Sequence, residues 1–204
     1  TCALPICRDE NPSDVFFKPD GTKMFFSGSE NAKIYQYNLT TAWDLSTATY
    51  YENFSVSSQE LAPNALRFNP DGTKMYMLGG NEATIFQYSL STAWDLGYAS
   101  YASKSLDVSS AEDYCTGMAF KNDGSRLYIL GFNADKVYQY DLTTAWDVST
   151  GSIANGYYSF VTYGVNPTGL DFRGYGDRFW VTPVSDSKVF QYECPTFIPR
   201  VRIL

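Results

Sequence analysis

The chain has 204 residues, among them 17 tyrosines and no histidine, and its formal net charge is −7 at pH 7. This acidic balance gives no basic surface for nucleic acid, and no apolar run approaches the roughly 18 residues of a membrane span. We therefore predict no nucleic-acid partner and no membrane span. The lack of histidine removes Ser-His-Asp and Cys-His nucleophiles and histidine-based metal sites, so we predict no metal and no cofactor.

A repeated unit organises the whole sequence. The segment that begins Phe68-Asn69-Pro70-Asp71-Gly72 has copies that begin at Phe17, Phe120 and Phe172, so the steps are 51, 52 and 52 residues. A period of this length is typical of repeat architectures. We place the repeats at residues 14–64, 65–116, 117–168 and 169–194, inside a single domain that spans residues 1–204.

The N-terminal stretch is the first element in chain order. Aligned backward from Phe17, residues 2–13 match residues 53–64, which form the last strand of a repeat and the loop after it. The chain is thus predicted to begin with a fourth strand at residues 2–8. Its first residue is Thr1 rather than methionine, so we expect a processed or trimmed start rather than a translation start.

Each repeat is predicted to hold four short antiparallel strands, because its apolar runs are rich in Phe, Tyr, Val and Ile and are bounded by turn residues. In the second repeat they cover residues 65–68, 74–78, 84–90 and 99–108. Asn69-Pro70-Asp71-Gly72 is a tight turn between the first two. We read such Asp-Gly pairs as turns rather than calcium loops, since the alternating oxygen ligands of a calcium loop are absent.

The aromatic motifs are interpreted as core. Tyr/Phe-Gln-Tyr recurs at residues 35–37, 86–88, 138–140 and 190–192. A sugar-stacking platform is the alternative, but a strand in the middle of a blade has both faces covered, so its aromatics fill the space between blades. The Gln side chains would satisfy backbone groups or each other between blades. Trp43, Trp94 and Trp146 are expected to plug gaps between adjacent blades.

The fourth repeat ends after its third strand, and the tail at residues 195–204 lacks the Thr-Ala-Trp-Asp link. We therefore predict an all-β four-bladed β-propeller whose N-terminal strand closes the last blade, one strand from the N-terminus and three from the C-terminus. The alternative is insertion of this terminal strand into a neighbouring molecule, which gives self-assembly. Arg67 and Asp171, from opposite blades, are predicted to pair across the axis.

Cysteines at positions 2, 7, 115 and 194 are an even set that suits disulfides in an oxidising compartment. In the repeat alignment Cys2 and Cys194 fall on neighbouring strand ends, so we predict a disulfide between them. Pairing of Cys7 with Cys115 stays open. Asn38 and Asn53 begin N-glycosylation triplets, so a secreted chain would be a glycoprotein. We expect an extracellular or virion-surface location.

The motif Phe-x-Pro-Asp-Gly-Thr-Lys-Met-Tyr, followed by Tyr-Gln-Tyr and Thr-Thr-Ala-Trp-Asp, resembles YVTN-type and related propeller repeats. It is most similar to a Trp-Asp-containing variety seen in bacterial secreted proteins and phage virion proteins. The resemblance covers about residues 14–192 and implies the propeller fold. Such propellers serve as adhesins, scaffolds and occasionally lactonase-like enzymes. In architecture alone, four blades also resemble the hemopexin domain.

The loops that differ between repeats are the candidate binding surface, because parts that only hold blades together should repeat. They emerge on one face and carry acidic and aromatic residues, and a protein or glycan partner is expected there. The candidate residues are Asp9, Glu10, Glu60, Glu82, Glu112, Asp113, Tyr114, Phe132, Asp135 and Tyr163. The alternative is a solvated acidic surface that keeps the protein in solution.

From these features we predict a non-enzymatic binding or assembly module. It would be an extracellular adhesin or lectin-like domain, or a virion or appendage structural protein. The alternative is a lactonase-like or glycoside-cleaving enzyme that uses loop carboxylates, whose geometry cannot be read from a sequence.

Overall fold

A computed structural model describes residues 8–159, 166–173, 177–184, 188–193 and 200–203. The chain divides into two compact units. The first unit comprises Thr1–Asn81 and Phe86–Lys104, and the second comprises Glu82–Ile85 and Ser105–Leu204. In the described part of the chain no helix is long and apolar enough to cross a membrane.

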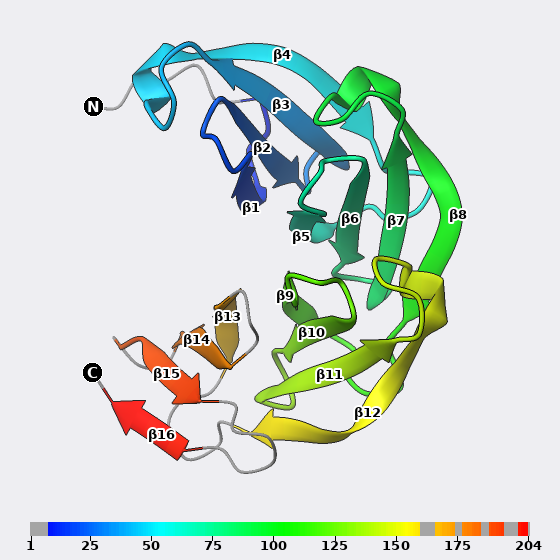
Figure 1. Cartoon of the computed structure of the whole chain (residues 1–204), viewed down its shortest axis with the longest axis vertical. Coiled ribbons are helices and arrows are strands. Elements are labelled where there is room, and N and C mark those ends of the chain that lie inside the picture. The colour runs from blue at the N-terminus through cyan, green and yellow to red at the C-terminus, as the bar shows by residue number, and fades with distance from the viewer. Residues whose placement is uncertain (1–7, 160–165, 174–176, 185–187, 194–199, 204) are drawn as a thin grey trace. The chain divides into compact units, whose positions relative to one another are not determined.

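The fold is all-β and consists of four antiparallel sheets, each with four strands in chain order (Figure 1). These sheets are the four blades of a β-propeller, which confirms the predicted fold class. Blade one is β1 (Pro12–Phe17), β2 (Lys23–Gly28), β3 (Lys33–Leu39) and β4 (Ala48–Ser55). Blade two is β5 (Pro63–Phe68), β6 (Lys74–Gly79), β7 (Thr84–Leu90) and β8 (Ala99–Asp107).

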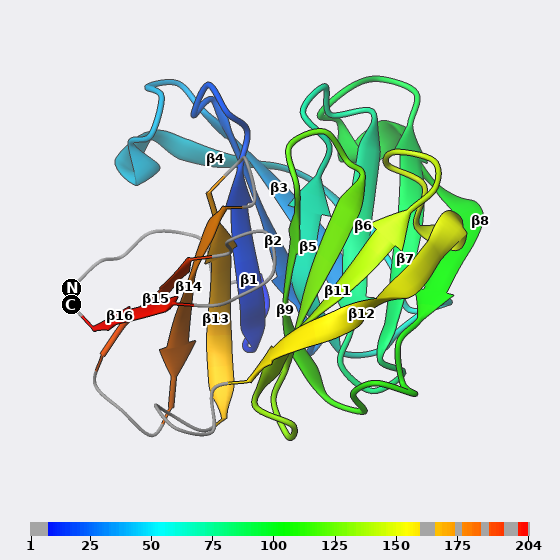
Figure 2. The same cartoon turned by 60° about the horizontal axis from the view of Figure 1, so that its bottom comes forward.

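The third and fourth blades belong to the second unit. Blade three is β9 (Cys115–Phe120), β10 (Arg126–Gly131), β11 (Lys136–Leu142) and β12 (Gly151–Ser159). Blade four is β13 (Pro167–Phe172), β14 (Arg178–Pro183), β15 (Phe190–Glu193) and β16 (Arg200–Ile203). Figure 2 shows β9 to β12 as one continuous sheet.

The Asp-Gly pairs form the hairpin turns that the sequence predicts. In blade two, Asp71 accepts hydrogen bonds from the backbone nitrogen and the hydroxyl of Thr73, at 2.9 and 2.6 Å. Gly72 has a φ of 71°, a left-handed conformation that glycine adopts without strain. The turn is therefore explained by local geometry and needs no bound ion.

The Thr-Ala-Trp-Asp links end in one short 3₁₀ turn each: η1 (Leu45–Thr47), η2 (Leu96–Tyr98) and η3 (Val148–Thr150). In blade two the Asp95 carboxylate caps η2 by accepting a hydrogen bond from the nitrogen of Gly97, at 3.0 Å. The Trp94 indole covers the hairpin turn of its own blade, because a Cβ on Gly72 would lie only 2.2 Å from it. Trp and Gly are thus packed as a pair.

Trp94 also reaches the neighbouring blade, as predicted. Its ring stacks at 6.2 Å from Phe16 of blade one and lies 5.3 Å from Phe68. Trp43 differs, because 59 % of its surface is exposed, against 7 % for Trp94. A plugging role therefore holds for Trp94.

The aromatic third strands lie in the core, as the sequence predicts. Tyr37 and Tyr88 are fully buried, and so is Gln36. Gln36 Oε1 accepts a hydrogen bond from the nitrogen of Leu96, at 2.9 Å, which links blade one to the 3₁₀ turn of blade two. An amide side chain thus satisfies a buried backbone donor between blades, and leaving that donor unpaired would cost about 1–3 kcal/mol.

The prediction for the fourth blade needs correction. Its outer strand is β16, which pairs antiparallel with β15 from Phe190↔Ile203 to Glu193↔Arg200. The C-terminal segment that we expected to be a tail therefore occupies the place predicted for residues 2–8. The free edge of β15 presents unpaired backbone N–H and C=O groups with which an extended segment can pair. The strand β16 matches β15 in length, because each has four residues. Residues 1–7 lie outside the described residues, as do Cys2, Cys7 and Cys194, so the disulfide stays a prediction.

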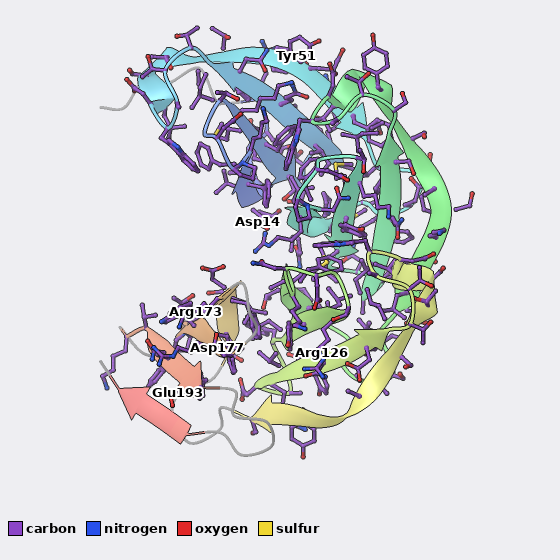
Figure 3. All side chains as sticks on the ribbon, in the orientation of Figure 1. Asp14, Tyr51, Arg126, Arg173, Asp177 and Glu193 are labelled. Carbon is purple, nitrogen blue, oxygen red and sulfur yellow. The ribbon has the colours of Figure 1, made fainter. Side chains whose placement is uncertain are left out.

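Arg67 pairs with a carboxylate other than the predicted Asp171. Its Nη1 lies 2.5 Å from Asp14 Oδ2 (Asp14 is labelled in Figure 3), and both side chains are 22 % exposed. The same oxygen accepts a hydrogen bond from the nitrogen of Leu66, at 2.9 Å. Asp14 lies on β1 and Arg67 lies on β5, so this ion pair joins blades one and two. Figure 3 also labels Arg126, which pairs with Asp141 at 3.1 Å on the exposed side of blade three.

Candidate functional site

Three of the predicted site residues are buried at equivalent places in the loops before the first strand of blades one, two and three. Asp9, Glu60 and Glu112 are only 8, 3 and 4 % exposed. Each carboxylate accepts a hydrogen bond from the backbone nitrogen two residues later, at 3.0, 2.8 and 3.1 Å respectively. Their shared role is to hold the loop, which leaves little surface for a ligand.

The carboxylates of Asp9 and Glu112 also hold a second loop. Asp9 accepts hydrogen bonds from the nitrogens of Glu30 and Asn31, both at 3.1 Å. Glu112 Oε2 accepts one from the nitrogen of Ala134, at 2.9 Å. The carboxylate therefore ties the loop before the first strand to the loop between the second and third strands.

A glycine faces each buried carboxylate at the end of the second strand. A Cβ added at Gly28, Gly79 or Gly131 would lie 2.2 to 2.3 Å from a carboxylate atom of Asp9, Glu60 or Glu112. In the fourth repeat the sequence has Gly164 at the acidic position and Pro183 at the glycine position. The acidic residue and the glycine are thus replaced together in the fourth repeat. This joint change is a sequence signal that the two residues pack on each other, and our interpretation of the loops as divergent did not use it.

The hydrogen bonds around Asp9 determine its protonation. Burial acts to raise the pKa of this carboxyl, but the backbone of Asn11, the side chain and backbone of Asn31 and the backbone of Glu30 together hold the pKa below its ordinary value. Asp9 is therefore ionised at neutral pH, as a clamp that accepts several hydrogen bonds should be.

The other predicted residues lie in different surroundings. Glu10 and Glu82 are exposed. Asp135 has a φ of 53°, and its carboxylate accepts a hydrogen bond from the nitrogen of Asn166 in the loop before blade four, at 2.7 Å. Tyr163 lies outside the described residues.

Four residues of blade three gather at one place on the surface, and we refer to Asp113, Tyr114, Phe132 and Asn133 as the blade-three loop cluster. The Asn133 amide donates a hydrogen bond to Asp113 Oδ1, at 2.9 Å. The rings of Tyr114 and Phe132 meet edge to face with their centroids 5.3 Å apart. Tyr114 is 42 % exposed, and Asp113 is exposed too. Three of these four residues were predicted to belong to the site.

The cluster is specific to blade three. At the places of Asp113 and Tyr114, blade two has Leu61 and Ala62, and at the place of Phe132 it has Gly80. The side-chain hydrogen bond from Asn133, followed by the contact with Glu112, holds the pKa of Asp113 below its ordinary value. The cluster thus offers an ionised carboxylate beside two aromatic rings, a combination that suits a polar ligand with an apolar face.

The thiol beneath this cluster is not a nucleophile. Cys115 is fully buried, and its Sγ donates a weak hydrogen bond to the carbonyl oxygen of Glu112, at 3.8 Å. Burial, with the nearby charges of Glu112 and Asp113, raises the pKa of this thiol to about 12. A thiol of this kind stays protonated at neutral pH and is chemically inert.

Two further predictions concern modification and metals. Asn38 and Asn53 lie on the paired strands β3 and β4 and are half-buried, and the Asn53 amide donates to the Tyr50 hydroxyl at 2.6 Å. Among the described residues no group of three or more His, Cys, Asp or Glu side chains is placed to hold a metal ion.

No protein-family model matches the sequence. No curated protein matches it significantly either. Solved structures do match the fold. One is a candidate 6-phosphogluconolactonase from Bacteroides uniformis, with a TM-score of 0.64 and 16 % identity, over 93 % of this chain and 53 % of that one.

Two other similar structures differ from each other in activity. The periplasmic gluconolactonase of Pseudomonas aeruginosa matches with a TM-score of 0.59 and 15 % identity, over 95 % of this chain and 53 % of that one. Hydrazine synthase from Kuenenia stuttgartiensis matches with a TM-score of 0.60 and 14 % identity, over 95 % of this chain and 49 % of that one. The chain spans about half the length of each of these structures, and the likeness establishes the β-propeller fold.

These comparisons correct the functional prediction. A non-enzymatic binding or assembly module was expected, and the chain was predicted not to be an enzyme. The three similar structures described above instead carry the names of enzymes, two of them lactonases.

Proposed function

We propose that this chain is a lactonase-like β-propeller that hydrolyses a sugar lactone at the blade-three loop cluster. The observation that carries the proposal is the cluster itself, in which an exposed ionised Asp113 is held by Asn133 beside the rings of Tyr114 and Phe132. The likeness to gluconolactonase structures supports this choice of reaction. We also propose that the repeats are of the YVTN type, which is a finer assignment than the β-propeller fold.

The roles follow from the chemistry of an ester ring. Asp113 accepts a proton from a water molecule as the water oxygen attacks the lactone carbonyl carbon. The bond between that carbon and the ring oxygen then breaks, the ring oxygen takes up the proton, and the product is the open hydroxy acid. General-base catalysis contributes about 10²–10⁴-fold in rate, and the low pKa of Asp113 places its contribution toward the lower end of that range, because a base works best when its pKa is near the working pH. Tyr114 offers an apolar face on which the C–H side of a sugar ring packs.

The charges around the cluster favour an uncharged lactone over a phosphorylated one. Glu112, Asp113 and Asp135 are all within this group of loops, and the chain as a whole carries a net charge of −7. A phosphate on the substrate would meet this negative field and be repelled. We therefore infer that the substrate is a neutral aldonolactone.

The test is hydrolysis of glucono-1,5-lactone by the purified chain, followed as acid release in a pH-stat above the spontaneous rate. Wild type should accelerate hydrolysis and Asp113→Asn should lose about 10²-fold or more in kcat/KM. Glu10→Gln, an exposed acid at the equivalent place of blade one, should keep the wild-type rate. No acceleration by wild type, or equal rates for wild type and Asp113→Asn, would reject the proposal.

An extracellular location is proposed as well. It is supported by the even set of four cysteines and by the periplasmic origin of one similar structure. Fractionation of the source cells with an antibody against the chain would test it.

A further inference from the structure

The loop before the first strand of each blade has one backbone nitrogen whose acceptor differs in blade four. In blades one, two and three this donor belongs to Asn11, Ala62 and Tyr114, and it bonds to the buried acid two residues earlier, at 3.0, 2.8 and 3.1 Å. In the fourth repeat Gly164 stands at the place of the acid. The equivalent donor, the nitrogen of Asn166, therefore has no carboxylate at that place in its own loop.

Asp135 of blade three supplies the acceptor instead. Its Oδ1 accepts a hydrogen bond from the Asn166 nitrogen, at 2.7 Å. Alanine stands at the place of Asp135 in blades one and two, as Ala32 and Ala83. All three residues have a left-handed backbone, with φ of 49° at Ala32, 42° at Ala83 and 53° at Asp135. The backbone conformation thus repeats, whereas the carboxylate is an addition in blade three.

A second hydrogen bond joins the same two blades. The Thr116 hydroxyl donates to the carbonyl oxygen of Pro167, at 2.7 Å. Thr116 lies on β9 and Pro167 is the first residue of β13, and both strands belong to the second unit. The bond from Asn166 to Asp135 is therefore part of a contact between neighbouring blades inside one unit.

The loop between β10 and β11 carries Phe132 and Asn133, and backbone hydrogen bonds fix it on either side of Asn133. The nitrogen of Phe132 donates to the carbonyl oxygen of Tyr114, at 2.9 Å. The nitrogen of Ala134 donates to the buried acid of the loop before β9, also at 2.9 Å. Asp135 then attaches the end of this loop to blade four. The direction of the Asn133 side chain therefore depends on where Asp135 is held.

We propose that Asp135 is a positioning residue for the blade-three loop cluster. By binding the loop of blade four, it holds Asn133 in the direction from which the amide meets Asp113. It holds the ring of Phe132 beside Tyr114 in the same way. The inference rests on the proposed function for its effect on catalysis alone, because the packing of the cluster is observable without a substrate.

The first test observes the cluster by NMR in the free protein. Asp135→Ala removes the acceptor and keeps a backbone that alanine adopts in blades one and two. The signals of the Asn133 side-chain amide should move, and the nuclear Overhauser effect between the rings of Tyr114 and Phe132 should weaken. Asp135→Gly also lacks the acceptor and takes a φ of 53° without strain, so it should show the same changes. Asp141→Ala, at an exposed position of the same blade, should show neither.

The second test measures kcat and KM for glucono-1,5-lactone. Asp135→Ala should lower kcat by about 10–10²-fold and change KM much less, because the loss lies in the orientation of the base. Asp135→Asn keeps an oxygen that can accept the same hydrogen bond and should recover most of the rate. Asn166→Gly should behave as wild type, because the donor is the backbone nitrogen and not the exposed side chain.

The two tests separate this inference from the proposed function. A wild type that does not hydrolyse the lactone would reject the proposed function, and the NMR signals would still decide the role of Asp135. Circular dichroism of each variant should match that of wild type. Unchanged Asn133 and ring signals in folded Asp135→Ala and Asp135→Gly would overturn the inference. In an active wild type, so would an unchanged kcat for Asp135→Ala, or an Asp135→Asn variant as slow as Asp135→Ala.

Discussion

Carboxylates at neighbouring positions in one loop have different tasks in this protein. Glu112 is buried and accepts backbone hydrogen bonds from Tyr114 and Ala134, whereas the next residue, Asp113, is exposed and contacts a side chain of another loop. The hydrogen-bond partners distinguish the two, because a carboxylate that holds several backbone donors cannot release them for a substrate. The repeat therefore separates residues that hold loops from a residue that is open to chemistry.

The acid and glycine pair of blade two gives a prediction about stability. Gly79→Ala should destabilise the fold by about 1–3 kcal/mol, because the added Cβ would overlap Glu60. Glu60→Ala should cost about 1–3 kcal/mol, since it removes the acceptor of the Ala62 amide. The double variant should lose less than the sum, as the overlap has gone.

Urea unfolding followed by circular dichroism measures all three variants. Gly97→Ala is the matched control, because the nearest atom to its Cβ is 3.3 Å away on its neighbour Asp95, and it should change stability little. Strictly additive losses for Gly79→Ala and Glu60→Ala would show that the two positions do not interact.

The hydrogen bond from Asn133 gives a prediction about pH. In wild type the pKa of Asp113 lies below its ordinary value of 3.8, so the carboxylate stays ionised and kcat/KM should fall only when the pH drops below that value. Asn133→Ala removes the main cause of the shift, so the pKa should rise and the acid limb of the pH profile should move to higher pH. The profile of initial rates of lactone hydrolysis measures this. An acid limb that stays in place would argue against Asp113 as the group that must be ionised.

Between elements, the contact of β1 with β5 depends on a half-buried ion pair. Asp14 accepts hydrogen bonds from both the Arg67 guanidinium and the Leu66 nitrogen, so a change at either end leaves a partner unsatisfied. Asp14→Ala and Arg67→Ala should each destabilise the chain, and the double-mutant cycle should give a coupling energy of about 0.5–3 kcal/mol. The cycle is measured by urea unfolding. A coupling energy near zero would show that the pair contributes nothing between the blades.

The strands of the second repeat show how much of the fold can be predicted from sequence. The predicted strand at residues 84–90 coincides with β7 (Thr84–Leu90), and the other three differ from the structure by one or two residues at an end. These strands are local features, since alternating apolar residues and the Asp-Gly turn determine them. The outer strand of blade four could not be predicted in this way, because β16 is defined by the free edge of β15 rather than by a pattern of its own.

The candidate site was only partly predictable for a similar reason. Differences between the repeats drew attention to Asp113, Tyr114 and Phe132, which lie together in blade three. They also drew attention to Asp9 and Glu60, whose role depends on a glycine about 19 residues away in the chain. Only a comparison of acid and glycine across all four repeats would have separated these two classes of residue.

For the whole molecule, the propeller determines where loops emerge but not what they do. Structures with this fold include enzymes of unrelated activity, so the function must come from residues that the repeats do not share. In this chain the exposed carboxylate and aromatic pair of blade three are such residues. We therefore propose that the substrate binds at blade three and that the equivalent loops of blades one and two have structural roles.

The most direct test of this assignment is a binding experiment in which no hydrolysis occurs. Amide chemical shifts of the isotope-labelled chain would be recorded by NMR while a lactam analogue of the sugar lactone is added. We expect saturable shifts at Asp113, Tyr114, Phe132 and Asn133, including the Asn133 side-chain amide, and little change around Asp9 and Glu60. Saturable shifts centred on the loops of blade one or two, or no shifts at any lactam concentration, would contradict it.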